Sequence, residues 1–177
     1  MKPTVASRIR SAVIDVPDFP KAGILFKDIA PVFLDAALCS DIADELIARL
    51  SVKPDAVCAI ESRGFFIGML LAHKLQVPLI PVRKEGKLPG SVRSFEYALE
   101  YSSAVLEIQR GVVQRGWKVL IHDDVLATGG TAVAAAELVQ QEGGRVSAFH
   151  FLVELSFLKG KAHLLPISEN IQSLVQY

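Results

Sequence analysis

The chain has 177 residues, of which 51% are apolar, enough to bury the core of one compact domain. Its 19 basic and 19 acidic side chains cancel, so no overall field favours nucleic acid or an anionic membrane. Two cysteines are too few for a disulfide framework, and no apolar run approaches the ~18 residues of a membrane-spanning helix. The start of the chain lacks the apolar segment of a secretory signal. These features predict a cytoplasmic protein without a nucleic-acid or membrane partner.

Hydrophobic periodicity predicts helices that alternate with short buried strands. An amphipathic helix is expected over residues 4–14, ended by the proline-containing stretch at 17–20, and a second helix is expected over 36–50. The next elements expected are a strand at 56–60, a helix at 65–75, strands at 78–82 and 118–122, a helix at 132–141 and a strand at 145–153. Such alternation is typical of βαβ units, so we expect an α/β fold with a mostly parallel twisted sheet flanked by helices.

Residues 84–110 depart from this pattern. The stretch from Lys84 to Arg93 is polar and contains two glycines and a proline, which predicts a long loop. Residues 95–101 then alternate between apolar and polar side chains, as in a strand with one wet face, and 104–109 can return as the second arm of a hairpin. A long loop beside an α/β sheet is either a mobile lid or a surface excursion, and the residues alone favour neither.

The strand expected at 118–122 runs directly into two adjacent carboxylates, Asp123 and Asp124, at the strand end where open α/β sheets bind ligands. Two such neighbours repel each other unless something binds there. The loop that follows is Ala127, Thr128, Gly129, Gly130 and Thr131. Its glycines let backbone N–H groups approach a ligand, and the helix start behind it favours an anion. The stretch therefore predicts a site in which acids hold sugar hydroxyls and amides hold the phosphate of a ribose 5-phosphate.

Residues 119–131, VLIHDDVLATGGT, resemble the 5-phosphoribosyl 1-diphosphate (PRPP) binding motif of the type I phosphoribosyltransferases. Other segments narrow the resemblance to the adenine phosphoribosyltransferase family. They are DFP at 18–20, GILFKDI at 23–29, ESRGF at 61–65, RKEGKLPG at 83–90, LEY at 99–101, LEIQ at 106–109, LVEL at 152–155 and SLVQY at 173–177. These segments keep the family's order and approximate spacing from residue 18 to the C-terminus.

The resemblance implies one domain over residues 1–177 with the type I phosphoribosyltransferase fold, a small hood at about 1–35 and a flexible hairpin lid at about 84–110. It implies a purine salvage enzyme that converts adenine and PRPP to AMP and pyrophosphate with Mg²⁺. The metal is expected to be held mainly by PRPP, pyrophosphate and water, with no metal-ligating residues assigned. A cytoplasmic homodimer is implied as well.

The same resemblance assigns roles around the sugar and diphosphate. Asp123 and Asp124 would accept hydrogen bonds from the ribose 2- and 3-hydroxyls, while residues 127–131 would hold the 5-phosphate. Arg63 would contact the diphosphate, and the Ser62–Arg63 peptide bond is expected to be cis. Lys84 and Lys87 are expected to add positive charge where pyrophosphate leaves.

For the base, the resemblance points to residues 23–27. Phe26 would lie against the adenine ring, and backbone groups of Leu25 and Lys27 would read its polar edge. Leu155 would close the other side, although a purely core role for Phe26 and Leu155 is the alternative.

Glu100 is the candidate general acid/base for the N9 proton of adenine, with Tyr101 beside it. Because neighbouring strand residues point to opposite faces, both reach a substrate only if the hairpin end bends. His122 departs from the family's usual aliphatic residue, and we expect a partly buried histidine with satisfied hydrogen bonds. Arg83 or Lys84 can also be expected to reach across a dimer interface.

Two other functions stay open at this point. One is a phosphoribosyltransferase for another base, such as hypoxanthine, xanthine or orotate, because the PRPP loop does not distinguish bases. The other is a regulator that binds PRPP without catalysis; the balanced charge and the lack of an added DNA-binding domain argue against it.

Overall fold

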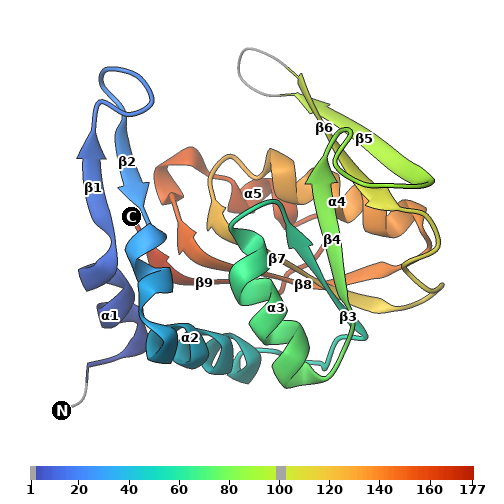
Figure 1. Cartoon of the computed structure of the whole chain (residues 1–177), viewed down its shortest axis with the longest axis horizontal. Coiled ribbons are helices and arrows are strands. Elements are labelled where there is room, and N and C mark those ends of the chain that lie inside the picture. Colours follow the sequence, from blue (N-terminus) through green and yellow to red (C-terminus); the bar gives the residue numbers. More distant parts are fainter. Residues whose placement is uncertain (1–2, 99–102) are drawn as a thin grey trace.

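The computed structural model describes residues 3–98 and 103–177. At its centre is a seven-stranded sheet with the strand order β5-β6-β4-β3-β7-β8-β9 (Figure 1). The strands are β3 (Ala56–Ile60), β4 (Leu79–Lys84), β5 (Val92–Ala98), β6 (Ser103–Gln109), β7 (Lys118–Leu126), β8 (Arg145–Glu154) and β9 (Ile171–Gln176). The five strands from β4 to β9 in this order are parallel, and β5 and β6 are antiparallel. The expected α/β fold with a mostly parallel sheet is confirmed.

Helices cover both faces of this sheet (Figure 1). They are α1 (Val5–Ala12), α2 (Ala36–Ala48), α3 (Gly64–Leu75), α4 (Gly130–Gln141) and the short α5 (Lys161–Leu164), with 3-10 turns η1 (Ala30–Leu34) and η2 (Ser156–Leu158). Helices α1, α2 and α3 share one buried cluster with the sheet, and α4 shares the other. β3 lies between them, so Val57 packs toward one cluster while Cys58 and Ile60 pack toward the other. This burial on both faces explains why β3 is a continuous apolar run.

Helix α3 lies close to the sheet because of a glycine. A Cβ added at Gly68 would come within 2.6 Å of the Cβ of Ala59 on β3, closer than real Cβ atoms approach. The Gly68 position therefore lets the helix backbone rest on the strand. None of the helices within the described ranges has the length and apolar character needed to cross a bilayer.

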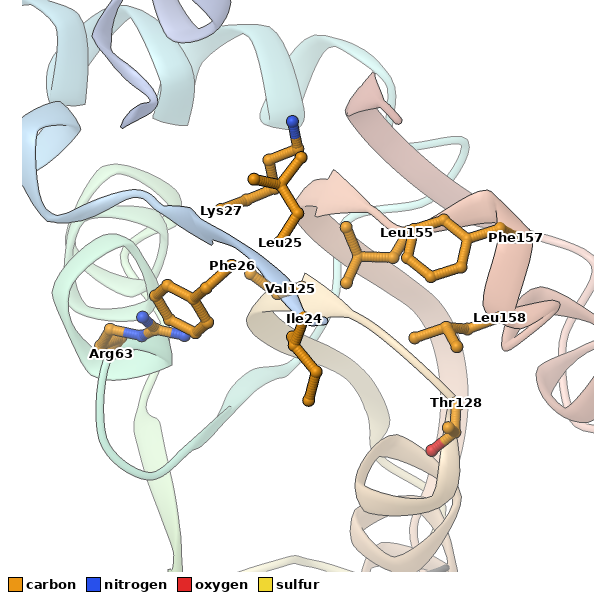
Figure 2. A pocket seen from close by; sticks show the side chains of 10 residues that line it. All are labelled: Ile24, Leu25, Phe26, Lys27, Arg63, Val125, Thr128, Leu155, Phe157 and Leu158. Carbon is orange, nitrogen blue, oxygen red and sulfur yellow. The ribbon is translucent and has the colours of Figure 1, made fainter. Parts of the chain in front are cut away.

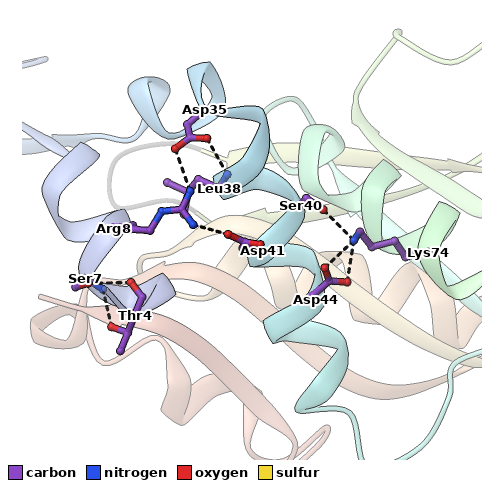
Figure 3. Close-up of polar contacts among 9 residues, drawn as sticks. All are labelled: Thr4, Ser7, Arg8, Asp35, Leu38, Ser40, Asp41, Asp44 and Lys74. Carbon is purple, nitrogen blue, oxygen red and sulfur yellow. Dashed lines mark hydrogen bonds and ion pairs between the residues drawn. The ribbon is translucent and has the colours of Figure 1, made fainter. Parts of the chain in front are cut away.

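Strands β1 (Ile14–Pro17) and β2 (Leu25–Asp28) form a separate antiparallel pair that rises at the left of Figure 1. Helix α1 fixes the base of this pair against α2 (Figure 3). Ile9 is fully buried, and Arg8 pairs with Asp35 at 3.1 Å and with Asp41. Exposed ion pairs stabilise a fold only weakly, so the burial of Ile9 contributes more.

Three strands were not expected from the sequence, namely β1, β2 and β9. The first helix ends at Ala12 because Val13 is extended, and the chain continues at once into β1. The hairpin expected from alternation is confirmed as β5 and β6, in register from the pair Val92 and Gln109 to the pair Ala98 and Ser103. Its second arm also pairs with β4, which makes the hairpin part of the main sheet.

The carboxyl ends of the parallel strands meet at one edge of the sheet. The segments that leave this edge contain Arg63 after β3, Lys84 at the end of β4, the acid pair and loop of β7, and Leu155 after β8. β2 approaches the same edge from the hood, and its Phe26 lines the cavities found there. Ligands of open α/β sheets bind at this edge.

Candidate active site

β7 extends through both carboxylates to Leu126, four residues past the predicted end at His122. Pairing with β8 continues through Asp123, opposite Phe151, and Val125, opposite Val153, so the acids belong to the strand. The loop that follows turns at Gly129, where φ is 88°, a conformation that favours glycine. α4 then begins at Gly130 without a side chain capping its first turn. Thr131 and Ala132 in its first turn line a cavity of about 50 Å³, and the start of a helix suits a small anion.

A second segment supports this loop from behind. A Cβ added at Gly160 would lie 2.1 Å from the carbonyl oxygen of Ala127 and 2.9 Å from the nitrogen of Gly129. His163 Nδ1 lies 2.8 Å from the carbonyl oxygen of Thr128, a hydrogen-bond distance. Neither residue could be predicted from local sequence, because both lie some thirty positions beyond the loop.

The two carboxylates share one cation. Arg63 Nε lies 2.6 Å from Asp124 Oδ2, and the Asp124 side chain is 8% exposed. Burial and the neighbouring Asp124 raise the pKa of Asp123 well above its usual value, and Arg63 only partly opposes this. Asp123 Oδ1 also accepts a hydrogen bond from the backbone N–H of Asp124 at 2.8 Å. Arg63 thus pairs with Asp124, while burial beside that second carboxylate makes ionisation of Asp123 less favourable than in water.

The predicted cis bond between Ser62 and Arg63 is wrong. The cis bond lies one residue earlier, between Glu61 and Ser62. Ser62 and Arg63 already belong to hydrogen-bonded turns that start α3, since their carbonyl oxygens accept from the N–H groups of Phe65 and Phe66 at 3.2 Å. Arg63 itself is helical, with φ −70° and ψ −27°.

The acids open onto a cavity of about 540 Å³. Its lining comes from six parts of the chain and includes Phe26, Arg63, Lys84, Asp123, Asp124, Ala127, Thr131 and Leu155. Eight residues predicted from sequence thus meet around one space. Glu61, Tyr97 and Leu106 line it too, without having been predicted.

A neighbouring cavity of about 390 Å³ lies between β2 and the segment after β8 (Figure 2). Phe26 borders it on one side, and Leu155 and Phe157 lie on the other. The guanidinium carbon of Arg63 stands 5.9 Å from the centre of the Phe26 ring, and Phe19 meets the same ring edge-on at 5.1 Å. This apolar slot with an aromatic wall suits a flat heteroaromatic ring.

Lys27 lines this slot, but its ammonium group points away from it. The ammonium pairs with Asp15 at 2.6 Å and lies 4.4 Å from the centre of the Tyr177 ring. Figure 2 shows it pointing away from Phe26 and Leu155. The ammonium group is therefore paired outside the slot, which is consistent with the expectation that Lys27 contacts a base through its backbone.

Two carboxylates accept hydrogen bonds from the end of β4 and the loop that follows it. Glu61 Oε2 accepts from Arg83 Nε at 2.9 Å and from the backbone N–H of Lys84 at 3.2 Å. Buried Glu107 accepts from the backbone N–H of Gly86 at 2.9 Å. Arg83 is thus held within its own chain.

Lys87 is exposed on the loop after β4 and lines none of the three cavities, although its carbonyl oxygen accepts from Arg83. The structure therefore brings Lys84, but not Lys87, to the site. Glu100 and Tyr101 lie outside the described residues.

His122 differs from its expectation. It is completely buried beneath α3, paired in register with His150 on β8, and within the described part of the chain no ring nitrogen of either histidine has a hydrogen-bond partner. Burial, together with His150, lowers the pKa of His122 to about 3, and burial lowers that of His150 to about 4. Both rings are consequently neutral in the folded protein near pH 7, and a satisfied histidine was the wrong prediction.

Comparison with known proteins agrees with this geometry. The phosphoribosyl transferase domain family matches residues 33–166. An adenine phosphoribosyltransferase from Cytophaga hutchinsonii is 46% identical over 170 residues, which cover 96% of this chain and 94% of that protein.

Two crystal structures are similar throughout. Adenine phosphoribosyltransferase from Thermoanaerobacter pseudethanolicus superposes with a TM-score of 0.92 at 44% identity, covering 97% of this chain and 99% of the other. The Saccharomyces cerevisiae enzyme, complexed with an imino-altritol bisphosphate and adenine, gives 0.90 at 39% identity, covering 96% and 98%. The chain therefore belongs to the phosphoribosyl transferase family, within its group of adenine phosphoribosyltransferases.

Proposed function

We propose that this protein transfers the 5-phosphoribosyl group of PRPP to N9 of adenine, forming AMP and pyrophosphate. The observation that carries the proposal is a row of three cavities along the carboxyl edge of the sheet. The 390 and 540 Å³ cavities share Phe26, Arg63, Val125 and Leu155, and the 540 and 50 Å³ cavities share Asp123, Val125, Ala127 and Thr131. A base, a ribose diphosphate and a 5-phosphate fit this sequence of apolar, acidic and amide-lined spaces.

The middle cavity holds the sugar in this mechanism. Asp124 accepts a hydrogen bond from one ribose hydroxyl, and Asp123 accepts one from the other. Fixing both hydroxyls orients C1 toward the base slot, which lowers the entropic part of the barrier. As the C1–O bond breaks, positive charge develops on the ribose ring, as in glycoside hydrolysis.

The leaving diphosphate needs positive charge. Arg63 and Lys84 line the cavity and stabilise the charge that develops on pyrophosphate. The oxygens of Asp123 and Asp124 are donors of the kind that Mg²⁺ takes, usually one or two carboxylates together with substrate phosphates. Bound there with the diphosphate, Mg²⁺ would supply Lewis-acid stabilisation of the leaving group. Lys87 remains a proposed contact for the diphosphate, reached from its exposed loop.

At the base, Phe26 lies against the adenine ring and Leu155 closes the slot, while backbone groups of Leu25 and Lys27 read the polar edge. Glu100 takes the N9 proton as the new bond forms, with Tyr101 beside it. The support for these last two roles is the LEY resemblance together with Tyr97 on β5 and Ala104 on β6, which line the 540 Å³ cavity from the described parts of the two strands.

Domain roles follow the same proposal. The hood, residues 1–35, supplies one wall of the base slot, and the segment 84–110 acts as the lid. A cytoplasmic location is supported by two buried, free cysteines, which suit a reducing compartment.

A homodimer completes the proposal. Apolar side chains stand exposed on neighbouring elements, with Leu34 at 88%, Phe66 at 54% and Met69 at 50% exposure. The ring of Phe33, next to Leu34, packs edge-on against Phe66 at 5.0 Å, which joins η1 and α3 into one apolar face. Such a face suits the twofold contact of a symmetric dimer. Light scattering after gel filtration would measure twice the chain mass, and a monomer would contradict the dimer.

The activity is tested by mixing the protein with Mg²⁺, PRPP and, separately, adenine, hypoxanthine, guanine or orotate. AMP formed from adenine alone is the expected result. Nucleotide formed from another base would reassign the substrate, and PRPP binding without any product would indicate a regulator. The control is the Asp123→Asn/Asp124→Asn variant, which keeps side-chain volume and removes both carboxyl groups.

A further inference from the structure

Tyr97 touches the phosphate loop from a different part of the fold. Its hydroxyl lies 3.3 Å from Thr131 Oγ1, although the two residues are 34 positions apart. Tyr97 stands on β5 and packs its ring against the cluster that α4 shares with the sheet. Thr131 is the second residue of α4. The contact therefore connects the hairpin to the helix end that borders the small anion cavity.

Thr131 takes part in two spaces at once. It lines both the 540 Å³ cavity and the 50 Å³ cavity at the start of α4, and Tyr97 lines the larger one. A threonine hydroxyl has one proton and two acceptor lone pairs, and so does a tyrosine hydroxyl apart from its higher acidity. In the pair seen here, only one of the two protons can lie between the oxygens.

The direction of this hydrogen bond determines what Thr131 can offer a ligand. If Thr131 donates to Tyr97, its proton is used and an anion meets only lone pairs. If Tyr97 donates to Thr131, the threonine proton is free to be donated to the anion. A phosphate oxygen accepts hydrogen bonds, so a bound phosphate selects the second direction.

We propose that Tyr97 is a positioning residue for phosphate binding, which donates its phenol proton to Thr131 so that Thr131 donates its own to the ligand. The inference rests on the proposed function, because it takes the anion at α4 to be the 5-phosphate of PRPP. The two hydrogen bonds act in series, and polarisation of the first strengthens the second at this half-buried pair. Tyr97 itself does not need to touch the substrate.

The test uses Tyr97→Phe, which keeps the ring and removes only the hydroxyl. Loss of the supporting bond should raise the KM for PRPP by about three- to tenfold and leave kcat and the KM for adenine nearly unchanged. Tyr177→Phe is the matched control, since it removes a phenol hydroxyl that is remote from the phosphate loop, and it should behave as the unaltered protein does. Unchanged melting temperatures would show that both variants are folded.

A double-mutant cycle separates positioning from general support. Thr131→Val keeps the branched shape and removes the hydroxyl through which Tyr97 acts. In the Thr131→Val background, Tyr97→Phe should add no further loss of PRPP affinity, whereas in Thr131→Ser it should still cost severalfold. A KM for PRPP within twofold of the unaltered protein in Tyr97→Phe, or losses that multiply in the double variant, would overturn the proposal.

Calorimetric titration with PRPP repeats the cycle without turnover. If the unaltered protein binds PRPP but makes no AMP, the proposed function fails, and the same cycle in Kd still decides the role of Tyr97. If PRPP does not bind at all, both proposals are wrong.

Discussion

Gly160→Ala tests whether the phosphate loop depends on the segment packed behind it. Gly160 has φ −58° and ψ −31°, which alanine adopts readily, so the backbone conformation of residue 160 is not the obstacle. The obstacle is space: the new Cβ would stand 2.1 Å from the Ala127 carbonyl oxygen, 2.9 Å from the Gly129 nitrogen and 3.0 Å from the Thr128 carbonyl carbon. All three atoms belong to the backbone of the loop.

Ordinary contact at such a position is 3.4–4 Å, so the Ala127 carbonyl has to move by about 1.3 Å. A misplacement of about 1 Å in a ligand-holding group costs up to ~100-fold in rate. We therefore expect kcat/KM for PRPP to fall by about 100-fold. Overpacking should also lower the free energy of unfolding by about 1–3 kcal/mol.

The assay follows AMP formation at varied PRPP, with urea unfolding measured in parallel. Gly144→Ala is the matched control, because its Cβ would stand 2.7 Å from Val113 Cγ1 and 3.0 Å from Val139 Cγ1, away from the loop. It should lose a similar amount of stability and keep its kcat/KM for PRPP. A folded Gly160→Ala protein with kcat/KM within threefold of the original, or an equal loss in Gly144→Ala, would refute the reasoning.

Asp124→Asn removes the charge held by Arg63 and should lower kcat/KM for PRPP by about 10- to 100-fold; a loss below threefold in steady-state kinetics would contradict the sugar-binding role. Phe26→Ala should raise the KM for adenine by about fivefold to 100-fold, with Phe26→Leu intermediate and the KM for PRPP little changed; equal effects on both substrates would argue for a packing role. The pKa values of His122 and His150 in the folded state lie below the unfolded value, so the unfolded chain binds more protons. The free energy of unfolding therefore falls as the pH drops below about 6.5. The expected loss is about 1.4 kcal/mol per histidine and pH unit, down to about pH 4. Urea unfolding at pH 7 and pH 5 should show this loss in the unaltered protein and a much smaller loss in His122→Leu/His150→Leu. An equal loss of unfolding free energy in both proteins would show that the histidines do not cause it.

The elements that the sequence predicted well are those with a strong local pattern. The strand at 56–60 is buried on both faces, so its apolar run begins and ends where the strand does. The loop at 127–131 combines glycines with a helix start just after two acids; the helix start is confirmed at Gly130, and the anion site there stays a prediction. The alternation of apolar and polar residues in the hairpin is also a local pattern, and the pairing of β5 with β6 confirms it.

Residues whose role depends on distant neighbours carried no such pattern. β7 was expected to stop before its acids, because carboxylates interrupt an apolar run; the β8 ladder nevertheless continues beside them. Tyr97, Gly160 and His163 reach the loop only through the tertiary fold. The strands β1 and β2 are four residues each and contain no fully buried residue, so they show no clear period.

The ion pair between Arg63 and Asp124 changes how two adjacent aspartates in this sequence are interpreted. Adjacent aspartates in a sequence suggest two free carboxylates, but here Arg63 already pairs with Asp124, and burial beside Asp124 raises the pKa of Asp123 well above its usual value. When PRPP binds, Arg63 would then release the carboxylate of Asp124 and bind a phosphate of the diphosphate. The ribose hydroxyls would bind the carboxylate oxygens that Arg63 has left. Arg63 and Lys84 thus balance the acidic side chains that line the same cavity, so the fold does not depend on a bound ligand to offset the charge of the two aspartates.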